Sequence, residues 1–155
     1  MLDVGDRAPD FVALATTGVS VSLAELRGSY VVLYFFPKAF TPGCQGETIR
    51  FRDAYPDLRA LGAEVIGVSV DDHKTQCDFA AETQAPFPMI GDESGEISRS
   101  YGVLRPYLSL DKRVTYVIDR DGIVRGAFEN EFQISRHLDE SLALLENLTP
   151  DRDPR

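Results

Sequence analysis

The most apolar run in the chain, residues 30–36, stops abruptly at Pro37. Apolar side chains occupy both alternating sets of positions in this run, so it predicts a strand buried on both faces, as in the middle of a parallel sheet. Parallel strands need a crossover connection, which is usually a helix. A helix is indicated directly after the turn at residues 37–43, because apolar residues then recur at helical spacing. The run therefore constrains the chain to an α/β fold with a turn at the end of its central strand.

The other predicted elements follow from periodicity and turn signals. In chain order they are a hairpin at 12–14 and 19–21, the central strand, the helix after it, a strand at 65–70, a helix at 74–84, a short helix up to Tyr101, a hairpin at 114–118 and 123–128, and a closing helix bearing Leu138, Leu142, Leu145 and Leu148. Two parallel strands joined by a helix and followed by an antiparallel pair are typical of the thioredoxin fold. We predict one such domain at residues 1–148 with an N-terminal β-hairpin extension, and a flexible tail at 149–155.

Three local features of the helices are also predicted. Ser22 is expected to cap a brief helical turn that ends at residues 27–28, and Ser135 to cap the closing helix. Pro56 falls inside the pattern of the first long helix, so a kink or break is expected near Tyr55.

Composition limits the classes of function. The formal charge of −9 over 155 residues disfavours nucleic acid and anionic membranes as partners. The longest apolar run is far shorter than the ~20 residues of a membrane helix, and the acidic start lacks the apolar segment of a signal peptide. Two cysteines do not make a disulfide scaffold, so we expect a reducing, cytoplasmic location.

Cys44 ends the turn and begins the predicted helix. Thr41 suits the N-cap and Pro42 the first helical position, which places Cys44 at about the third helical residue. Free N–H groups and the positive end of the helix dipole stabilise a thiolate there, and the thiolate is the nucleophilic form of cysteine. A lone cysteine is commonly a small buried hydrophobe, but this placement indicates a thiol that can attack the O–O bond of a peroxide.

The turn also resembles a known signature. Pro37-x-x-x-Thr41-x-x-Cys44 is similar to the peroxiredoxin motif, and the resemblance extends through residues 5–11, 35–36, Glu47, 68–71, 87–88, Asp92 and 113–122. On these residues the chain resembles the AhpC/TSA family, in particular its bacterioferritin-comigratory (PrxQ) branch, and residues 40–47 also resemble the one-cysteine AhpE-like proteins.

The resemblance implies roles for five residues. Cys44 would be the peroxidatic cysteine, Thr41 would orient the thiolate and the peroxide, and Arg113 would favour the thiolate and stabilise the transition state. Pro37 would shape the turn, and Glu47 would hold the arginine network. Without the resemblance, Arg113 would be read as a solvated charge at a strand end, and Glu47 equally well as a helix-start acid that complements the dipole.

The implied activity is the reduction of hydrogen peroxide and organic hydroperoxides through a sulfenic acid on Cys44. Electrons would return from a thioredoxin-like or glutaredoxin-like protein or from a small thiol, and no metal, flavin or nucleotide cofactor is required. A monomer and a homodimer both fit the resemblance. The alternative is a peroxide-responsive redox sensor or regulatory protein that uses the same thiol without turnover.

Cys77 is the candidate resolving cysteine, but it departs from the family pattern. One branch places a second cysteine where this chain has Ile49, and another where it has Ala80, three residues after Cys77. If Phe79 faces the core, Cys77 lies about 160° away around the helix and is exposed. A disulfide to Cys44 would then require local unwinding, because the two Cα atoms must come within ~7 Å.

Three interpretations of Cys77 stay open: a resolving cysteine, a bystander, or a metal ligand together with His73 at i, i+4 spacing. His73 is otherwise a solvated residue at a helix start, and His137 is expected on the polar face of the closing helix.

Overall fold

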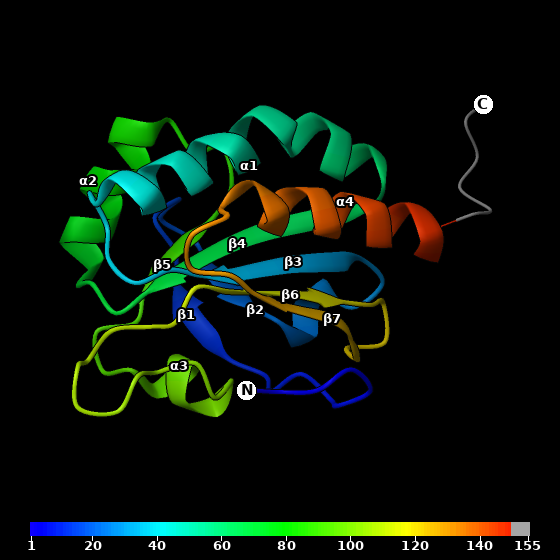
Figure 1. Cartoon of the computed structure of the whole chain (residues 1–155), viewed down its shortest axis with the longest axis horizontal. Helices are drawn as coiled ribbons and strands as arrows, with labels where there is room; N and C mark the ends of the chain where they lie inside the picture. Colours follow the sequence, from blue (N-terminus) through cyan, green and yellow to red (C-terminus); the bar gives the residue numbers. More distant parts are fainter. Residues whose placement is uncertain (150–155) are drawn as a thin grey trace.

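A five-stranded sheet of strand order β5-β4-β3-β6-β7 forms the centre of the molecule in a computed structural model that describes residues 1–149 (Figure 1). The elements in chain order are β1 (Val12–Leu14), β2 (Ser20–Ser22), the 3-10 helix η1 (Ala24–Leu26), β3 (Tyr30–Phe35), α1 (Pro42–Ala60), β4 (Ala63–Ser69), α2 (His73–Thr83), β5 (Met89–Gly91), α3 (Glu96–Ser100), β6 (Val114–Ile118), β7 (Val124–Glu129) and α4 (Ser135–Leu148).

Strand β3 is the middle strand, and all six of its residues are buried, as the apolar run predicts. It pairs in parallel with β4 and antiparallel with β6. The β6–β7 hairpin extends the sheet on one side, and β5 pairs in parallel with β4 on the other. The predicted parallel pair and antiparallel hairpin are thus confirmed.

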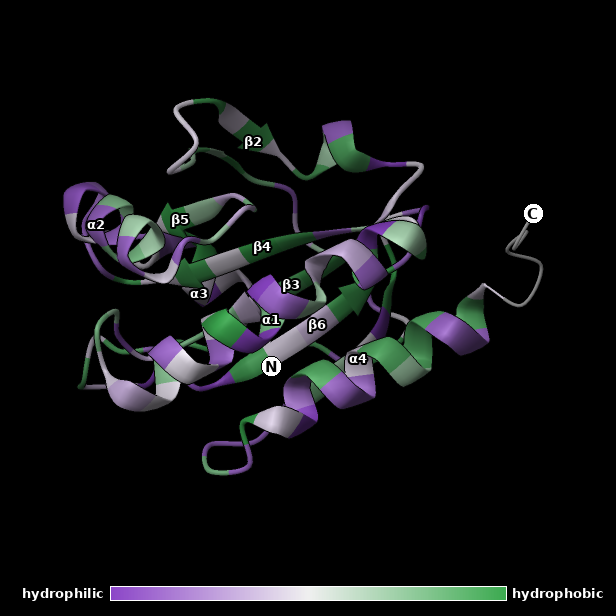
Figure 2. Ribbon diagram, turned by 90° about the horizontal axis from the view of Figure 1, so that it is seen from above, coloured by the Kyte–Doolittle hydropathy of each residue, from purple (hydrophilic) through white to green (hydrophobic). Residues whose placement is uncertain are grey.

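Both faces of the sheet are covered, so β3 contributes alternate residues to two hydrophobic clusters. Helices α1 and α4 lie over one face, with α2 beside them at the β5 edge, whereas α3 and the N-terminal segment lie on the other (Figure 1). Val32 and Tyr34 pack in the cluster beneath α1 and α4, and Leu33 and Phe35 in the opposite cluster. Figure 2 shows β3 and β4 as mostly hydrophobic, while hydrophilic and hydrophobic residues alternate along α4.

Three sequence expectations need correction. Ser22 lies in β2, and the N–H of Ala24 in η1 is satisfied by the carboxylate of Asp10 at 2.8 Å. Ser135 is the first residue of α4, and the N-cap position belongs to Ile134. Helix α1 continues through Pro56 to Ala60 without a break, because proline removes one backbone donor but the packing of the apolar face holds the helix.

Two further differences concern segment ends. Strand β5 was not predicted, because only three residues follow the Pro86-Phe87-Pro88 segment before the chain turns again. Residue 149 was assigned to the tail, but Thr149 is the C-cap of α4, and its hydroxyl donates to the Leu145 carbonyl at 2.7 Å. The rest of the predicted tail lies outside the described residues. Within residues 1–149, no helix is long and apolar enough to cross a membrane.

A buried carboxyl pair fixes the start of α3. Asp92 accepts hydrogen bonds from the N–H groups of Ile97 and Ser98, and the Ser98 hydroxyl lies 2.9 Å from carboxyl oxygens of both Asp92 and Asp111. Asp111 is fully buried, and its Oδ1 has no hydrogen-bond partner among residues 1–149. Burial raises the pKa of Asp111 to about 7, although the hydrogen bond from Ser98 acts to lower it.

Replacing Asp111 should therefore change the pH dependence of stability. A carboxyl whose pKa is raised on folding stabilises the protein fully below its ordinary pKa of 3.8, and this contribution is lost as the pH rises towards about 7. Asp111→Asn cannot ionise, so we expect its free energy of unfolding at pH 8 to exceed that of the wild type by about 1–3 kcal/mol, with little difference near pH 4.

Urea unfolding at both pH values measures this difference. Asp139→Asn, at an exposed position of α4, is the matched control and should change stability by less than about 0.5 kcal/mol. An Asp111→Asn variant that is destabilised equally at both pH values would contradict the prediction.

Candidate active site

The turn between β3 and α1 is fixed by hydrogen bonds to a residue at the end of the neighbouring strand, β4. Asp71, just beyond β4, accepts hydrogen bonds from the backbone N–H of Ala39 at 2.7 Å and from the Ser69 hydroxyl at 2.6 Å. Phe40 adopts a left-handed backbone conformation with φ of 67°, which is unfavourable for a bulky residue and is typical of functional turns. Its ring packs edge-on against Phe79 of α2 with the centroids 5.3 Å apart. The turn that delivers Cys44 is thus fixed by contacts with both β4 and α2.

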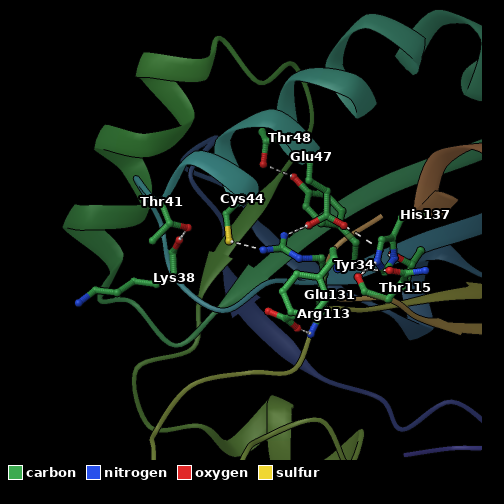
Figure 3. Close-up of polar contacts among 12 residues, drawn as sticks. Tyr34, Lys38, Thr41, Cys44, Glu47, Thr48, Arg113, Thr115, Glu131 and His137 are labelled. Carbon is green, nitrogen blue, oxygen red and sulfur yellow. Dashed lines mark hydrogen bonds and ion pairs between the residues drawn. The ribbon is translucent and has the colours of Figure 1, made fainter. Parts of the chain in front are cut away.

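Cys44 is the third residue of α1, as predicted, and its side chain is 0% exposed. Arg113, the residue before β6, donates a hydrogen bond from Nη2 to Cys44 Sγ over 3.4 Å (Figure 3). A guanidinium in this position stabilises a negatively charged sulfur more than a neutral thiol. The structure thus brings Cys44 and Arg113, two of the predicted site residues, into contact.

Glu47 lies one helical turn after Cys44 and completes the cluster. Its Oε1 accepts a hydrogen bond from Arg113 Nη1 at 2.7 Å, and both side chains are buried. This buried ion pair distinguishes Glu47 from an exposed helix-start acid, which was the alternative interpretation. Figure 3 shows the guanidinium of Arg113 between Cys44 and Glu47, so one cation serves two acceptors.

Burial and the neighbouring charges shift the pKa values of Glu47 and Arg113 in opposite directions. Burial raises the pKa of Glu47 to about 7, although the charge and hydrogen bond of Arg113 lower it. Burial also lowers the pKa of Arg113, but the charges of Glu47 and Cys44 outweigh that effect, and the Arg113 pKa is raised overall. Arg113 therefore stays charged at any physiological pH, whereas Glu47 binds and releases a proton near neutrality.

Thr41 occupies the N-cap position of α1, as predicted, but its side chain is used differently. Its hydroxyl donates to the Lys38 carbonyl at 2.8 Å and so closes the turn. The oxygen keeps its lone pairs, which can still accept a hydrogen bond from a bound peroxide. Pro37 begins the turn and is half-buried.

His137 belongs to the cluster, in contrast to the prediction of a polar-face residue. It is fully buried; Nε2 lies 2.7 Å from the Asn130 carbonyl, Nδ1 lies 2.8 Å from the Thr115 hydroxyl, and Nδ1 lies 3.8 Å from Glu47 Oε2. The signal was present in the sequence, because His137 precedes Ser141 by four residues and Leu145 by eight, and all three share the buried face of α4. Thr115 was not predicted, because a single threonine within an apolar strand does not by itself indicate a functional residue.

Cys77 lies apart from this cluster. It is half-buried in α2 rather than exposed as predicted, its Sγ is 3.4 Å from His73 Nε2, and both cysteines are free thiols. His73 is the exposed first residue of α2, as predicted. Among residues 1–149, no group of three Cys, His or carboxylate residues is arranged to hold a metal ion, so a metal site at this pair has no further support.

A cavity of about 680 Å³ opens beside the first turns of α1, between Arg50 and residues 132–136. Ile134 connects it to the site, because Ile134 Cδ1 and Arg113 Nη2 both border the position that a side chain at Gly43 would occupy. Phe132 is 90% exposed at its rim. The cavity thus offers room for a molecule larger than hydrogen peroxide next to the Cys44 cluster.

A buried thiol at a helix start, hydrogen-bonded to an arginine on a sheet of this topology, defines a thiol-dependent peroxidase of the thioredoxin-fold class. The chain belongs to the AhpC/TSA family, whose model matches residues 4–127. It is 38% identical over 145 residues to "Peroxiredoxin Q, chloroplastic" of Populus jackii. The matched residues cover 93% of this chain and 68% of the relative.

The solved structures agree with this assignment. Peroxidoxin BcpB from Mycobacterium tuberculosis superposes with a TM-score of 0.89 at 34% identity and covers 96% of this chain and 99% of its own. A Cys-to-Ser mutant of Xylella fastidiosa PrxQ has the same fold, with a TM-score of 0.86 at 23% identity over 96% of this chain and 98% of its own. The predicted thioredoxin fold and peroxiredoxin family are therefore confirmed, and the family favours an enzyme over a sensor without turnover.

Two glycines in α1 allow a sharp test of the Arg113–Cys44 contact. A Cβ at position 43 would lie 3.1 Å from Arg113 Nη2, whereas a Cβ at position 46 would meet nothing within 4 Å. Gly43→Ala should therefore displace the guanidinium by a few tenths of an ångström and weaken its hydrogen bond to the sulfur. We expect this to lower kcat/KM for hydrogen peroxide by up to about tenfold, the effect of losing roughly one charged hydrogen bond.

Gly46→Ala is the matched control. It should raise the free energy of unfolding by about 0.5–1 kcal/mol through helix propensity and leave the rate with hydrogen peroxide unchanged. Steady-state kinetics and urea unfolding of both variants measure the two effects, and an equally active Gly43→Ala variant would count against the contact.

Proposed function

We propose that Cys44 is the peroxidatic cysteine of a peroxidase that reduces hydrogen peroxide and organic hydroperoxides. The observation that carries the proposal is the buried hydrogen bond from Arg113 Nη2 to Cys44 Sγ, with Glu47 on the other side of the same guanidinium. An arginine held in this way is ready to stabilise the charge that develops when the sulfur attacks. No further conformational change is needed to bring the cation to the thiol.

In the proposed reaction, the Cys44 thiolate attacks one peroxide oxygen, the O–O bond breaks, and the other oxygen leaves as water or an alcohol after taking a proton. Cys44 becomes a sulfenic acid, and the peroxide is reduced by two electrons. Thr41 would direct the peroxide through its hydroxyl, which the Lys38 carbonyl orients, and Pro37 would fix the turn. The cavity beside Ile134 would hold the organic group of a larger hydroperoxide.

We propose a thioredoxin-like or glutaredoxin-like protein or a small thiol as the reductant. Support comes from the free state of both thiols and the lack of contact between them: Cys44 is buried in α1, whereas Cys77 contacts His73 in α2. A reducing, cytoplasmic location and a monomeric or homodimeric state are predictions from the sequence and the family that fit this scheme.

Cys44→Ser tests the role of the sulfur. We expect it to abolish peroxidase turnover with a thioredoxin, thioredoxin reductase and NADPH system, because a serine hydroxyl is not ionised at neutral pH and peroxide does not oxidise it to a form that thiols can reduce. NADPH consumption measures turnover, and a thermal melt of the variant confirms that it is folded. Turnover that persists in Cys44→Ser would refute the proposal.

Intact mass after one equivalent of peroxide tests how the sulfenic acid is resolved. We expect one added oxygen both in the wild type and in Cys77→Ala, because a disulfide would require the first turn of α1 to unwind. The loss of two hydrogens in the wild type, with one added oxygen in Cys77→Ala, would instead identify Cys77 as the resolving cysteine.

A further inference from the structure

His137 is held in one tautomer by its surroundings. Nε2 lies 2.7 Å from the carbonyl oxygen of Asn130, which can only accept a hydrogen bond, so Nε2 carries a hydrogen and donates it. Nδ1 is therefore the nitrogen that gains or loses a proton. It points towards the peroxidase cluster rather than towards solvent (Figure 3).

The surroundings of Nδ1 suit both of its protonation states. The Thr115 hydroxyl, at 2.8 Å, donates to Nδ1 when the imidazole is neutral and accepts from it when the imidazole is charged. A rotation of one hydroxyl hydrogen is the only change between the two states. His137 can thus take up a proton without rearranging the buried side chains around it.

Glu47 faces the same nitrogen with its second oxygen. Oε1 is used by Arg113, whereas Oε2 is buried and has no hydrogen-bond donor among residues 1–149. His137 Nδ1 lies 3.8 Å from this oxygen. A buried carboxylate oxygen without a donor is costly. A proton on Oε2 would neutralise this carboxylate, and a proton on Nδ1 would place a positive charge 3.8 Å from it.

We propose that His137 is a positioning residue of the peroxidase centre, and that the Glu47–His137 pair takes up the proton that Cys44 loses when it forms the thiolate. The inference rests on the proposed function. With Arg113 charged, ionisation of Cys44 beside an unprotonated pair would leave one net negative charge in the buried cluster. Uptake of the proton by the pair keeps the cluster neutral.

The proton is accounted for through the reaction. The thiol transfers it to the pair, and the thiolate attacks the peroxide. The proton of the peroxide leaves with the water or alcohol, and the stored proton returns to the sulfenate to give the sulfenic acid. The sum is thiol plus hydroperoxide to sulfenic acid plus alcohol or water, with no net proton released.

The other groups around the pair are compatible with uptake near neutral pH. The groups that face it are Glu47 from α1, Arg113 from the position before β6, Tyr34 from β3, Glu131 from the loop before α4 and Glu140 from α4. Burial raises the pKa of Glu47 to about 7, and burial, together with the charge of Arg113, lowers the pKa of His137. Tyr34 stays neutral, because burial raises its pKa well above the ordinary value.

The pH profile of Cys44 oxidation tests the inference. His137→Gln should move the profile of the second-order rate with hydrogen peroxide to higher pH by about one unit, and so lower the rate on the acidic side about tenfold. Glutamine keeps a donor for the Asn130 carbonyl but has no nitrogen that titrates, so the pair loses one of its two proton-binding atoms. The chain has no tryptophan, so competition with a haem peroxidase follows the rate in a single turnover.

His73→Gln is the matched control, because His73 is exposed at the start of α2, and its profile should superimpose on the wild type. A superimposed His137→Gln profile, or a rate reduced by the same factor at every pH, would overturn the inference. Either result would leave the proposed function intact, because the proposed function fails only if peroxidase turnover persists in Cys44→Ser.

A second measurement does not depend on the folding of a His137 variant. Nitrogen chemical shifts of His137 follow its titration in the wild type and in Cys44→Ser. Because a thiolate favours the protonated pair, and linkage is reciprocal, the midpoint should be lower in Cys44→Ser by about half a pH unit or more. Equal midpoints would exclude the coupling.

Discussion

The guanidinium of Arg113 makes the interaction on which the site depends, because it joins two buried side chains of α1, Cys44 and Glu47. It donates to Cys44 Sγ from Nη2 and to Glu47 Oε1 from Nη1. Lysine could not replace it, since a single ammonium lacks the planar fork that reaches two acceptors in fixed directions. The first turn of α1 is thereby tied to the sheet, and a helix start becomes a chemical centre.

The register of the sheet explains why Arg113 meets Cys44. Strand β3 runs antiparallel to β6, and Phe35 at its end pairs with Val114 at the beginning of β6. The residue before Val114 is Arg113, so the arginine enters the sheet where the Cys44 turn leaves it. Asp71 follows the end of β4, the parallel neighbour of β3, and fixes the turn from the other side. Residues far apart in sequence thus meet because three strand ends share one edge.

Sequence alone predicted the parts of the site that sit on strong local signals. The buried strand, the turn and the helix start located Cys44 and Thr41, and the family motif added Arg113 and Glu47. The sequence did not predict the position of His137, because a polar residue in an amphipathic helix is assigned to the solvent side unless its tertiary partners are known. The uninterrupted helix at Pro56 and the hydrogen bond that the Asp10 carboxylate accepts from Ala24 N–H in η1 have the same origin: contacts across the fold override local preference.

The buried charges of the cluster have a consequence for its surroundings. Among residues 1–149, the buried atoms Glu47 Oε2 and Arg113 Nε have no hydrogen-bond partner, and they lie beside a hydrophobic cluster that includes stacked Tyr34 and Phe51. Charges in such a place destabilise the fold unless they are paired, and the same low polarity strengthens the attraction of Arg113 for a thiolate. A more polar pocket would relieve the unpartnered atoms but weaken that attraction. The burial of the cluster therefore has a direct role, because it keeps Arg113 and Cys44 away from the solvent that would screen one from the other.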